Sequence, residues 1–345
     1  MHASTIERIR LAVIDIGTNS IRLTVAEVLE SGGIRLLDDE KVLTRLGRGL
    51  QETGHLDEDA MEASLTAISH LRRIAEGFRV AEVRVIATAA VREAANGPAF
   101  VESLEARTGL RANVISAREE ARLAFLSVQQ SFDLGESPTA VVDIGGGSCE
   151  VVLSRGGVIE QIYTLPLGAV RLTERFDLLG EISPDAYRAM RRSIFEVLES
   201  EVGRPPLFPQ VMIGTGGTFT NLASMVSHRR MRSVASDLLP LNVRGCEVQH
   251  SEVRHLVEDL RKLTPWQRAR FPGLSTDRAD IIVAGLTIVD RLLRYLIVNR
   301  LVTHDQGIRT GCLVSMIRAH CPSSSAGVDA VDRMASVRRF ATSCR

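Results

Sequence analysis

Cysteine is scarce in this sequence of 345 residues, and the few cysteines are not arranged in pairs. They are odd in number and scattered, and none belongs to a C-x-x-C motif. The five are Cys149, Cys246, Cys312, Cys321 and Cys344. His250 and His255 are five positions apart, a spacing that does not bring both onto one face of a helix. The sequence therefore predicts neither a zinc site nor a disulfide framework, and it favours a reducing compartment.

An excess of charge and a long hydrophobic run are also missing. The 42 basic residues balance the 42 acidic residues, whereas proteins that coat nucleic acid usually carry a basic surface. The first ten residues, MHASTIERIR, lack the apolar core of a signal peptide. The longest apolar stretch, 281–289, is too short to span a membrane. We therefore expect a cytoplasmic protein that binds neither nucleic acid nor a membrane.

Two phosphate-binding signatures are absent as well: a G-x-x-x-x-G-K motif, and a G-x-G-x-x-G motif between a strand and a helix. What the sequence contains instead is an internal repeat. Residues 11–25, LAVIDIGTNSIRLTV, align with residues 139–153, TAVVDIGGGSCEVVL. Alanine, valine, aspartate, isoleucine, glycine and serine coincide in register. This predicts two related halves, each beginning with the same strand–turn–strand unit.

Strands and helices alternate along the chain, which predicts an α/β fold. Apolar spacing, caps and glycine stops predict helices at 57–78, 99–109, 118–132, 181–202 and 278–298. Apolar runs predict strands at 11–15 and 112–116, and a buried strand running into a loop at 83–91.

Both repeated hairpins carry an Asp-Ile-Gly turn that suits phosphate binding. Glycine lets backbone N–H groups converge on an anion, and neighbouring hydroxyls add donors. The strand-end aspartates, Asp15 and Asp143, can hold Mg²⁺. A plain β-hairpin also uses glycine in its turn, but the duplication favours phosphate binding. A third glycine loop, 214–221, opens a helix whose N-terminus attracts anions. Its candidate phosphate ligands are Thr215, Gly216 and Gly217.

The segment ISAREEARLAF (115–125) contains two adjacent glutamates. Ser116 and Glu119 have the spacing of a capping box, which gives Glu119 a structural role. Glu120 is left in the first turn of the helix without such a role. It is a candidate general base that positions a water molecule; the alternative is a solvated first-turn glutamate favoured by the helix dipole.

Seven segments in order resemble one protein family. They are DIGTNSIRL, ATAAVREAAN, ISAREEARLAF, DIGGGSCEVV, LPLGAVRLTERF, GTGGTFTNLA and DRADIIVAG. The chain closely resembles the exopolyphosphatase/guanosine pentaphosphate phosphatase family, within the actin–hexokinase–Hsp70 ATPase superfamily. The resemblance implies two ribonuclease-H-like domains flanking a cleft, and Mg²⁺-assisted hydrolysis of a terminal phosphate. We place the domains at 1–124 and 125–320, followed by a linker and an arginine-rich tail at 321–345.

The resemblance also implies roles for individual residues. Glu120 matches the catalytic base, and Arg92 matches an arginine placed at the phosphates. Asp143 and Glu150 match the acidic pair near the metal and the water, and Asp15 completes the predicted metal set. The predicted phosphate loops contribute Asn19, Ser20, Gly145, Gly146, Gly147 and Ser148. The positions associated with holding a guanosine polyphosphate are Arg22 and Arg278.

Arg22 and Glu150 occupy equivalent positions of the two hairpins. We predict that they approach the cleft from opposite walls, one serving binding and the other metal or water activation. Some positions depart from the family pattern: Ala117 replaces a frequent glycine, and Gln306 and Thr310 replace arginine and glutamate. Cys149 lies inside the phosphate loop, where we interpret it as a small apolar filler rather than a nucleophile.

The predicted activity is that of an exopolyphosphatase, which removes the terminal phosphate of inorganic polyphosphate. Short chains are favoured because the extra C-terminal helical domains of longer relatives are missing. Hydrolysis of guanosine pentaphosphate (pppGpp) is the alternative within this class, and an ATP-dependent kinase is a further one. A sensor that binds pppGpp or ppGpp with little turnover is the alternative from another class. Relatives suggest a homodimer. A basic track for the substrate is predicted among Arg45, Arg48, Arg118, Arg171, Arg191, Arg192, Arg229 and Arg230.

Overall fold

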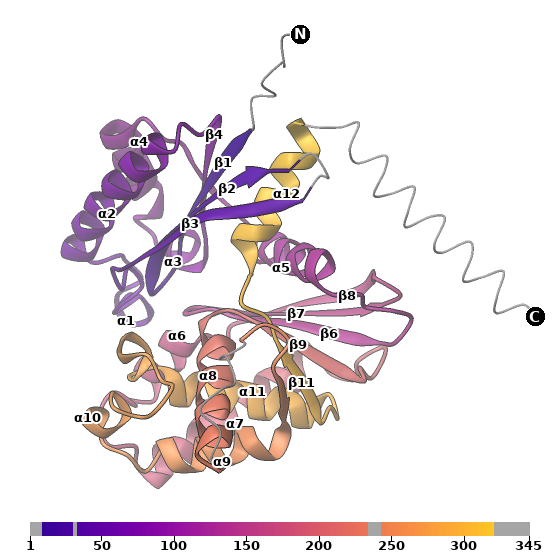
Figure 1. Cartoon of the computed structure of the whole chain (residues 1–345). Coiled ribbons are helices and arrows are strands. Elements are labelled where there is room, and N and C mark those ends of the chain that lie inside the picture. Colours follow the sequence, from indigo (N-terminus) through magenta and orange to yellow (C-terminus); the bar gives the residue numbers. More distant parts are fainter. Residues whose placement is uncertain (1–8, 30–32, 234–242, 321–345) are drawn as a thin grey trace, which may run out of the picture.

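The computed structural model describes residues 9–29, 33–233 and 243–320, which form two α/β halves, each built around one sheet (Figure 1). The first sheet has the strand order β3-β2-β1-β4-β5, and the second has the order β10-β11-β9-β6-β7-β8. The first five strands are β1 (Arg10–Ile16), β2 (Ser20–Val28), β3 (Ile34–Leu43), β4 (Glu82–Ala87) and β5 (Ala112–Val114). The others are β6 (Thr139–Ile144), β7 (Cys149–Arg155), β8 (Val158–Leu165), β9 (Val211–Thr215), β10 (Glu247–Gln249) and β11 (Arg300–Thr303).

The two sheets share one topology over five strands, and β10 extends the second sheet antiparallel to β11. In the first, β1, β2 and β3 are antiparallel neighbours, and β4 and β5 run parallel to β1 on its other side. In the second, β6, β7 and β8 form the antiparallel unit, and β9 and β11 are the parallel strands. The equivalence of 11–25 and 139–153 predicted two related halves, and the sheet pairing confirms it.

Alternation along the central strands decides which side chains face the space between the halves. In β1, Ala12 and Ile14 pack into a core with the helices α2 (Glu58–Gly77) and α4 (Gly97–Thr108). Leu11 and Val13 point to the opposite face. Because side chains alternate in a strand, Asp15 lies on that second face. The same parity places Asp143 of β6 on the face of Val141, toward α5 (Ala117–Ser131).

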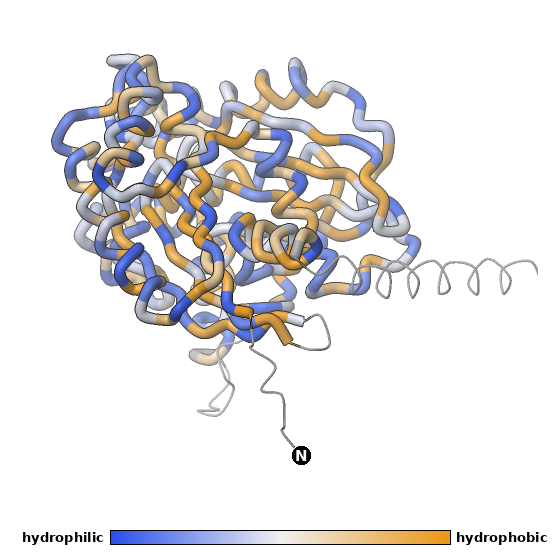
Figure 2. The backbone as a smooth tube through the Cα atoms, turned by 90° about the horizontal axis from the view of Figure 1, so that it is seen from above, coloured by the Kyte–Doolittle hydropathy of each residue, from blue (hydrophilic) through white to orange (hydrophobic). Residues whose placement is uncertain are grey.

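Two helices fill the space between the sheets. α12 (Ile308–His320) packs on β1 and β2, α5 packs on β6, β7 and β8, and the two helices pack on each other (Figure 1). The remaining helices of the second half cover its outer face: α6 (Ala169–Arg175), α7 (Pro184–Glu201), α8 (Gly217–Ser233), α9 (His250–Leu260), α10 (Pro265–Arg268) and α11 (Ile282–Tyr295). Hydrophobic stretches run through the interior, and hydrophilic segments lie mostly at the periphery (Figure 2).

The predicted helices are present with small shifts of their ends. The stretch 83–91 differs: β4 ends at Ala87, and a short helix, α3 (Ala89–Glu93), follows where a loop was expected. A short apolar run does not distinguish strand from helix by its period, and the alanines of this run are strong helix formers.

The predicted boundary at residue 124 falls inside α5, and α12 contacts the first sheet although it was assigned to the second half. The helix contacts therefore do not follow the division 1–124 and 125–320. The predicted tail, 321–345, lies outside the described residues. Within the described part of the chain, none of the helices has the length and apolar content needed to cross a bilayer.

Candidate active site

The turns of the two repeated hairpins meet at the centre of the molecule. Each is closed by the same backbone hydrogen bond, from Gly17 N–H to Ser20 O at 3.2 Å and from Gly145 N–H to Ser148 O at 3.0 Å. A Cβ on Gly146 would lie 2.8 Å from Cβ of Thr18, and one on Gly147 would lie 2.9 Å from Cβ of Ala89. Both glycines are thus required because the turn of one half lies directly against residues of the other.

A cavity of about 130 Å³ lies between these turns. Fourteen of the sixteen predicted site residues line it: Asp15, Asn19, Ser20, Arg22, Glu120, Asp143, Gly145, Gly146, Gly147, Ser148, Glu150, Gly216, Gly217 and Arg278. Arg92 and Thr215 do not line it. Arg22 enters from the first half and Glu150 from the second, as the repeat predicted.

Arg92 acts on the cavity through Glu120. Its Nη1 donates to the backbone oxygen of Ile115 at 2.8 Å and also to Oε1 of Glu120, and its side chain forms an ion pair with that carboxylate. α3 and α5 supply the two residues. Arg92 is thus placed to orient the candidate base, and its contact with the phosphates stays a prediction.

The start of α5 holds Glu120 toward the cavity. Oγ of Ser116 accepts a hydrogen bond from Glu119 N–H at 3.2 Å, which confirms the predicted cap. The second half of the predicted capping box is replaced, because the Glu119 carboxylate lies 3.9 Å from Arg122. Glu119 is partly exposed whereas Glu120 is buried. The alternative of a solvated glutamate at position 120 is therefore wrong.

Burial raises the pKa of four carboxyl groups in the cavity, those of Asp15, Glu120, Asp143 and Glu150. The pKa of Glu120 rises to about 7 although Arg92 opposes the shift, and the pKa of Asp15 rises to about 6 against Arg309 and Arg22. Burial, reinforced by Glu120 and Asp143, raises the pKa of Glu150 well above its usual range. The pKa of Asp143 also rises through burial. Such crowding of carboxyl groups is stabilised by a cation placed among them.

Several buried polar atoms of the site have no hydrogen-bond partner in the protein. The donors are Nδ2 of Asn19, Nε of Arg22 and Nε of Arg278, which suit phosphate oxygens. The acceptors include Oδ1 of Asp15 and Oε1 of Glu150, which suit a hard cation. No group of three or more His, Cys, Asp or Glu side chains in the described residues is placed to hold a metal alone. Mg²⁺ commonly uses one or two carboxylates together with substrate phosphates and water, and the unpartnered oxygens of Asp15 and Glu150 suit such a site.

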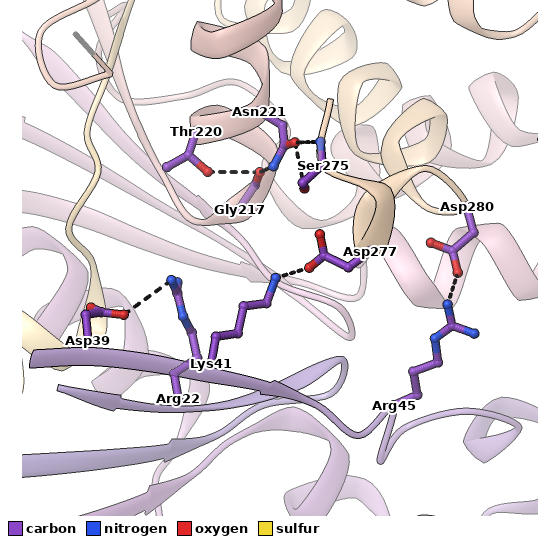
Figure 3. A network of polar contacts seen from close by, with 10 residues as sticks. All are labelled: Arg22, Asp39, Lys41, Arg45, Gly217, Thr220, Asn221, Ser275, Asp277 and Asp280. Carbon is purple, nitrogen blue, oxygen red and sulfur yellow. Dashed lines mark hydrogen bonds and ion pairs between the residues drawn. The ribbon is translucent and has the colours of Figure 1, made fainter. Parts of the chain in front are cut away.

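Two glycines leave space for the side chains of Asp143 and Arg278 beside the cavity. Gly216 has φ +90°, and a Cβ there would lie 2.6 Å from Oδ1 of Asp143. A Cβ on Gly217 would lie 2.1 Å from Nη2 of Arg278. The amide of Asn221 ties the start of α8 to the loop of Arg278: Nδ2 donates to Gly217 O at 2.9 Å, and Oδ1 accepts from Ser275 N–H at 2.8 Å (Figure 3).

Ion pairs join the halves beside the cavity. Lys41 of β3 pairs with Asp277 of the 3₁₀ turn η1 (Thr276–Arg278), and Nη2 of Arg45 lies 2.9 Å from Oδ2 of Asp280 (Figure 3). Arg171 of α6 donates from Nε to Gly147 O at 2.7 Å and pairs with Glu93 of α3. The protein thus holds the two walls together through side chains.

Arg309 lines the cavity and was not among the predicted site residues. It lies in the first turn of α12, and its Nη1 lies 2.9 Å from Oδ2 of Asp39 and donates to Leu23 O at 3.1 Å. Asp39 also pairs with Arg22 at 3.6 Å. A signal existed: the segment 303–313, already noted for its departures from the family pattern, contains this arginine.

The predicted basic track does not form one open surface. Four of its eight arginines are paired with carboxylates: Arg45, Arg171, Arg229 and Arg230. Arg191 lies in a separate cavity.

Cys149 is fully buried, and burial raises the pKa of its thiol well above the usual range. Its interpretation as an inert filler is consistent with this environment.

Two halves that share one topology, joined at paired glycine turns around a cavity of carboxylates and unpartnered donors, define an actin-like fold. The model of the Ppx/GppA phosphatase family matches residues 24–320. The chain belongs to the Ppx/GppA phosphatase family, as the resemblance indicated.

The chain is similar to exopolyphosphatase 2 of Mycobacterium tuberculosis, with 30% identity over 320 residues that cover 89% of this chain and 98% of the relative. Exopolyphosphatase 1 of Mycobacterium leprae is 29% identical over 313 residues, 88% of each chain. These relatives are named exopolyphosphatases, enzymes that hydrolyse phosphoanhydrides, and membership of their family confirms the predicted enzyme class.

Solved structures agree with the fold. The crystal structure of the Ppx/GppA family member of Aquifex aeolicus has a TM-score of 0.74 at 30% identity, covering 91% of this chain and 99% of that one. An exopolyphosphatase from Cytophaga hutchinsonii has a TM-score of 0.81 at 25% identity, covering 90% and 98%. The predicted two-domain actin-like architecture is therefore confirmed.

Proposed function

We propose that this protein is an exopolyphosphatase that removes the terminal phosphate of inorganic polyphosphate. The observation that carries the proposal is the convergence, in one cavity, of Glu120 with the unpartnered donors of Asn19, Arg22 and Arg278. The names of the relatives support the substrate class. The cavity of about 130 Å³ is below the roughly 300–1,000 Å³ of pockets that enclose a whole drug-sized ligand, which favours the end of a chain over a whole nucleotide.

In the mechanism, the glycine turns and the donors of Asn19, Arg22 and Arg278 hold the terminal phosphoryl group. Glu120 accepts a proton from a water molecule as the water attacks phosphorus, and the anhydride bond to the next phosphate breaks. Arg92 keeps the Glu120 carboxylate ionised and oriented. Catalysis comes mainly from positioning and electrostatics, as in other phosphoryl transfers.

Asp143 and Glu150, with Asp15, would hold Mg²⁺, which when bound neutralises charge on the phosphoryl oxygens. The buried and unpartnered oxygens of Asp15 and Glu150 support this assignment. A cytoplasmic location and a homodimer belong to the proposal as expectations.

Hydrolysis of pppGpp is the second candidate. Arg22 and Arg278 face the same cavity, and each has a buried Nε without a partner, so both can bind further phosphates of a nucleotide. A sensor with little turnover is disfavoured, because binding alone does not need Glu120 placed next to Arg92 at the cavity.

The test is phosphate release from short-chain polyphosphate, long-chain polyphosphate and pppGpp, each with and without Mg²⁺. We expect Mg²⁺-dependent release, fastest from short chains. Faster release from pppGpp would assign the second candidate. Tight binding of ppGpp with no release from any substrate would overturn the enzymatic proposal in favour of the sensor.

A further inference from the structure

A second cavity, of about 330 Å³, lies between α7, α9 and α11 in the second half. It shares no lining residue with the catalytic cavity. These helices lie on the side of the second half that faces away from the first sheet (Figure 1). Its volume falls within the roughly 300–1,000 Å³ typical of small-molecule pockets.

Each of the three helices contributes an arginine to this cavity. They are Arg191 of α7, Arg254 of α9 and Arg294 of α11. No carboxylate of the described residues forms an ion pair with any of the three. Arg191 lies over the ring of Tyr187, 5.6 Å from its centroid, and its Nε is buried without a hydrogen-bond partner. The cation–π contact orients this guanidinium, yet its hydrogen-bonding capacity is left unused.

The two carboxylates of the lining are already engaged. Asp290 accepts from Nε and Nη2 of Arg291 at 3.0 and 2.7 Å, and its other oxygen lies 2.8 Å from Nε2 of His250. Glu258 accepts from Nε and Nη2 of Arg261 at 2.9 and 2.6 Å. The negative charge of the wall is therefore neutralised locally, and the three guanidinium groups remain without a direct ion-pair partner among the described residues.

The geometry points to a binding site for an oligophosphate anion, a chain of about three phosphates. Arginine binds phosphate through paired N–H donors, and three arginines from three helices match charges spaced along a short chain better than one orthophosphate. A peptide would need free backbone partners, whereas the lining residues lie mostly in helices whose backbone groups bond within the helix. The ligand is either inorganic or the phosphate chain of a nucleotide.

The test is calorimetric titration of the full chain with methylene-bridged triphosphate, whose P–C bonds resist anhydride hydrolysis. Arg254→Ala/Arg294→Ala removes two exposed charges from the cavity. Arg192→Ala/Arg204→Ala removes two exposed charges from the same half outside it. We expect the first variant to lose one equivalent of bound probe relative to the control variant, or to bind that equivalent at least tenfold more weakly. The comparison between variants makes the result independent of binding in the catalytic cavity.

A parallel titration with guanosine 5′-(β,γ-methylene)triphosphate identifies the source. An arginine-dependent equivalent with the inorganic probe assigns inorganic oligophosphate, and one seen only with the nucleotide assigns a nucleotide. Equal stoichiometry and affinity in both variants, with both probes, would overturn the site. Circular dichroism of the variants verifies that they are folded.

Discussion

Arg22 and Glu150 occupy the same position of two repeated hairpins. In the backbone register of β1 and β2, Arg22 lies opposite Asp15, and in that of β6 and β7, Glu150 lies opposite Asp143. Both line one cavity, but the environments differ. The Arg22 side chain is 35% exposed, whereas Glu150 is 2% exposed. The repeat places the two positions symmetrically, but the residue types differ: we expect Arg22 to bind phosphate and Glu150 to act on the metal or the water.

This asymmetry predicts a division of kinetic effects. Arg22→Ala removes a charge-assisted phosphate contact worth ~1.5–3 kcal/mol, so we expect KM to rise about tenfold or more with little change in kcat. Glu150→Gln should lower kcat by at least about a hundredfold with KM nearly unchanged, since it acts on the reacting centre. Steady-state kinetics with short polyphosphate measures both. If both variants changed mainly in KM, or both mainly in kcat, the predicted difference between the two residues would be contradicted.

Glu120→Gln removes the proposed base. We expect kcat to fall by roughly 10²–10⁴-fold, the range for general-base catalysis, while substrate binding persists. Glu119→Gln is the matched control, because Glu119 lies in the same helical turn but is partly exposed and does not line the cavity. Phosphate release by the Glu120 variant at the rate of the control would show that another group is the base.

The pH dependence of turnover follows from the same residue. Glu120 has a pKa of about 7, raised by burial. A base must be deprotonated, so kcat should decline as the pH falls through about 7 and level off above it. Arg92 opposes the rise in the pKa of Glu120; Arg92→Ala should therefore move this limb to higher pH. If kcat of that variant declines at the same pH as in the parent, Arg92 does not control the ionisation of the base.

His304 predicts a pH effect on stability. It is fully buried, its Nε2 lies 3.1 Å from Oγ of Ser127, and burial lowers its pKa to about 4. The unfolded chain binds a proton near pH 6.5, whereas the folded protein does so only near pH 4. The free energy of unfolding should therefore fall between pH 6.5 and pH 4, by up to ~3 kcal/mol from this group.

His304→Gln isolates that contribution, because glutamine keeps a polar partner for Ser127 but does not titrate. Asp15 and Glu120, with raised pKa values, change stability in the opposite sense, so the difference between variant and parent is the measurement. Denaturant unfolding at pH 7 and pH 5 provides it. Equal pH slopes in the two proteins would contradict the assignment.

The pairs Lys41–Asp277 and Arg45–Asp280 cross between the halves. Exposed ion pairs contribute only ~0–1 kcal/mol each to folding, so Asp277→Asn/Asp280→Asn should scarcely change unfolding. We expect instead a wider separation of the halves, seen as a larger radius of gyration by X-ray scattering, and a higher KM. Glu62→Gln, which breaks the pair with Arg107 inside the first half, is the control. An identical radius for both variants would exclude a role in closure.

The sequence predicts those parts of the site whose residues lie close together in the chain. The repeat is local, so the hairpins, their glycines and the Arg22–Glu150 equivalence all follow from the order of the amino acids alone. The ion pair of Arg92 with Glu120 was not predicted, because the direction of a long side chain depends on packing between α3 and α5. Arg309 was missed because it lies in the first turn of a helix that returns to the first sheet from the end of the second half.

The packing of α12 on the first sheet has a practical consequence for expressing the two halves separately. A gene fragment that ends with α5 would lack α12 and would expose the apolar face of Leu11, Val13 and Ala26 that α12 covers. Neither half can therefore be expressed whole as a contiguous fragment that ends after α5 or begins there. A circular permutant that encodes α12 ahead of β1 would make the first half continuous, since the two elements already lie in contact.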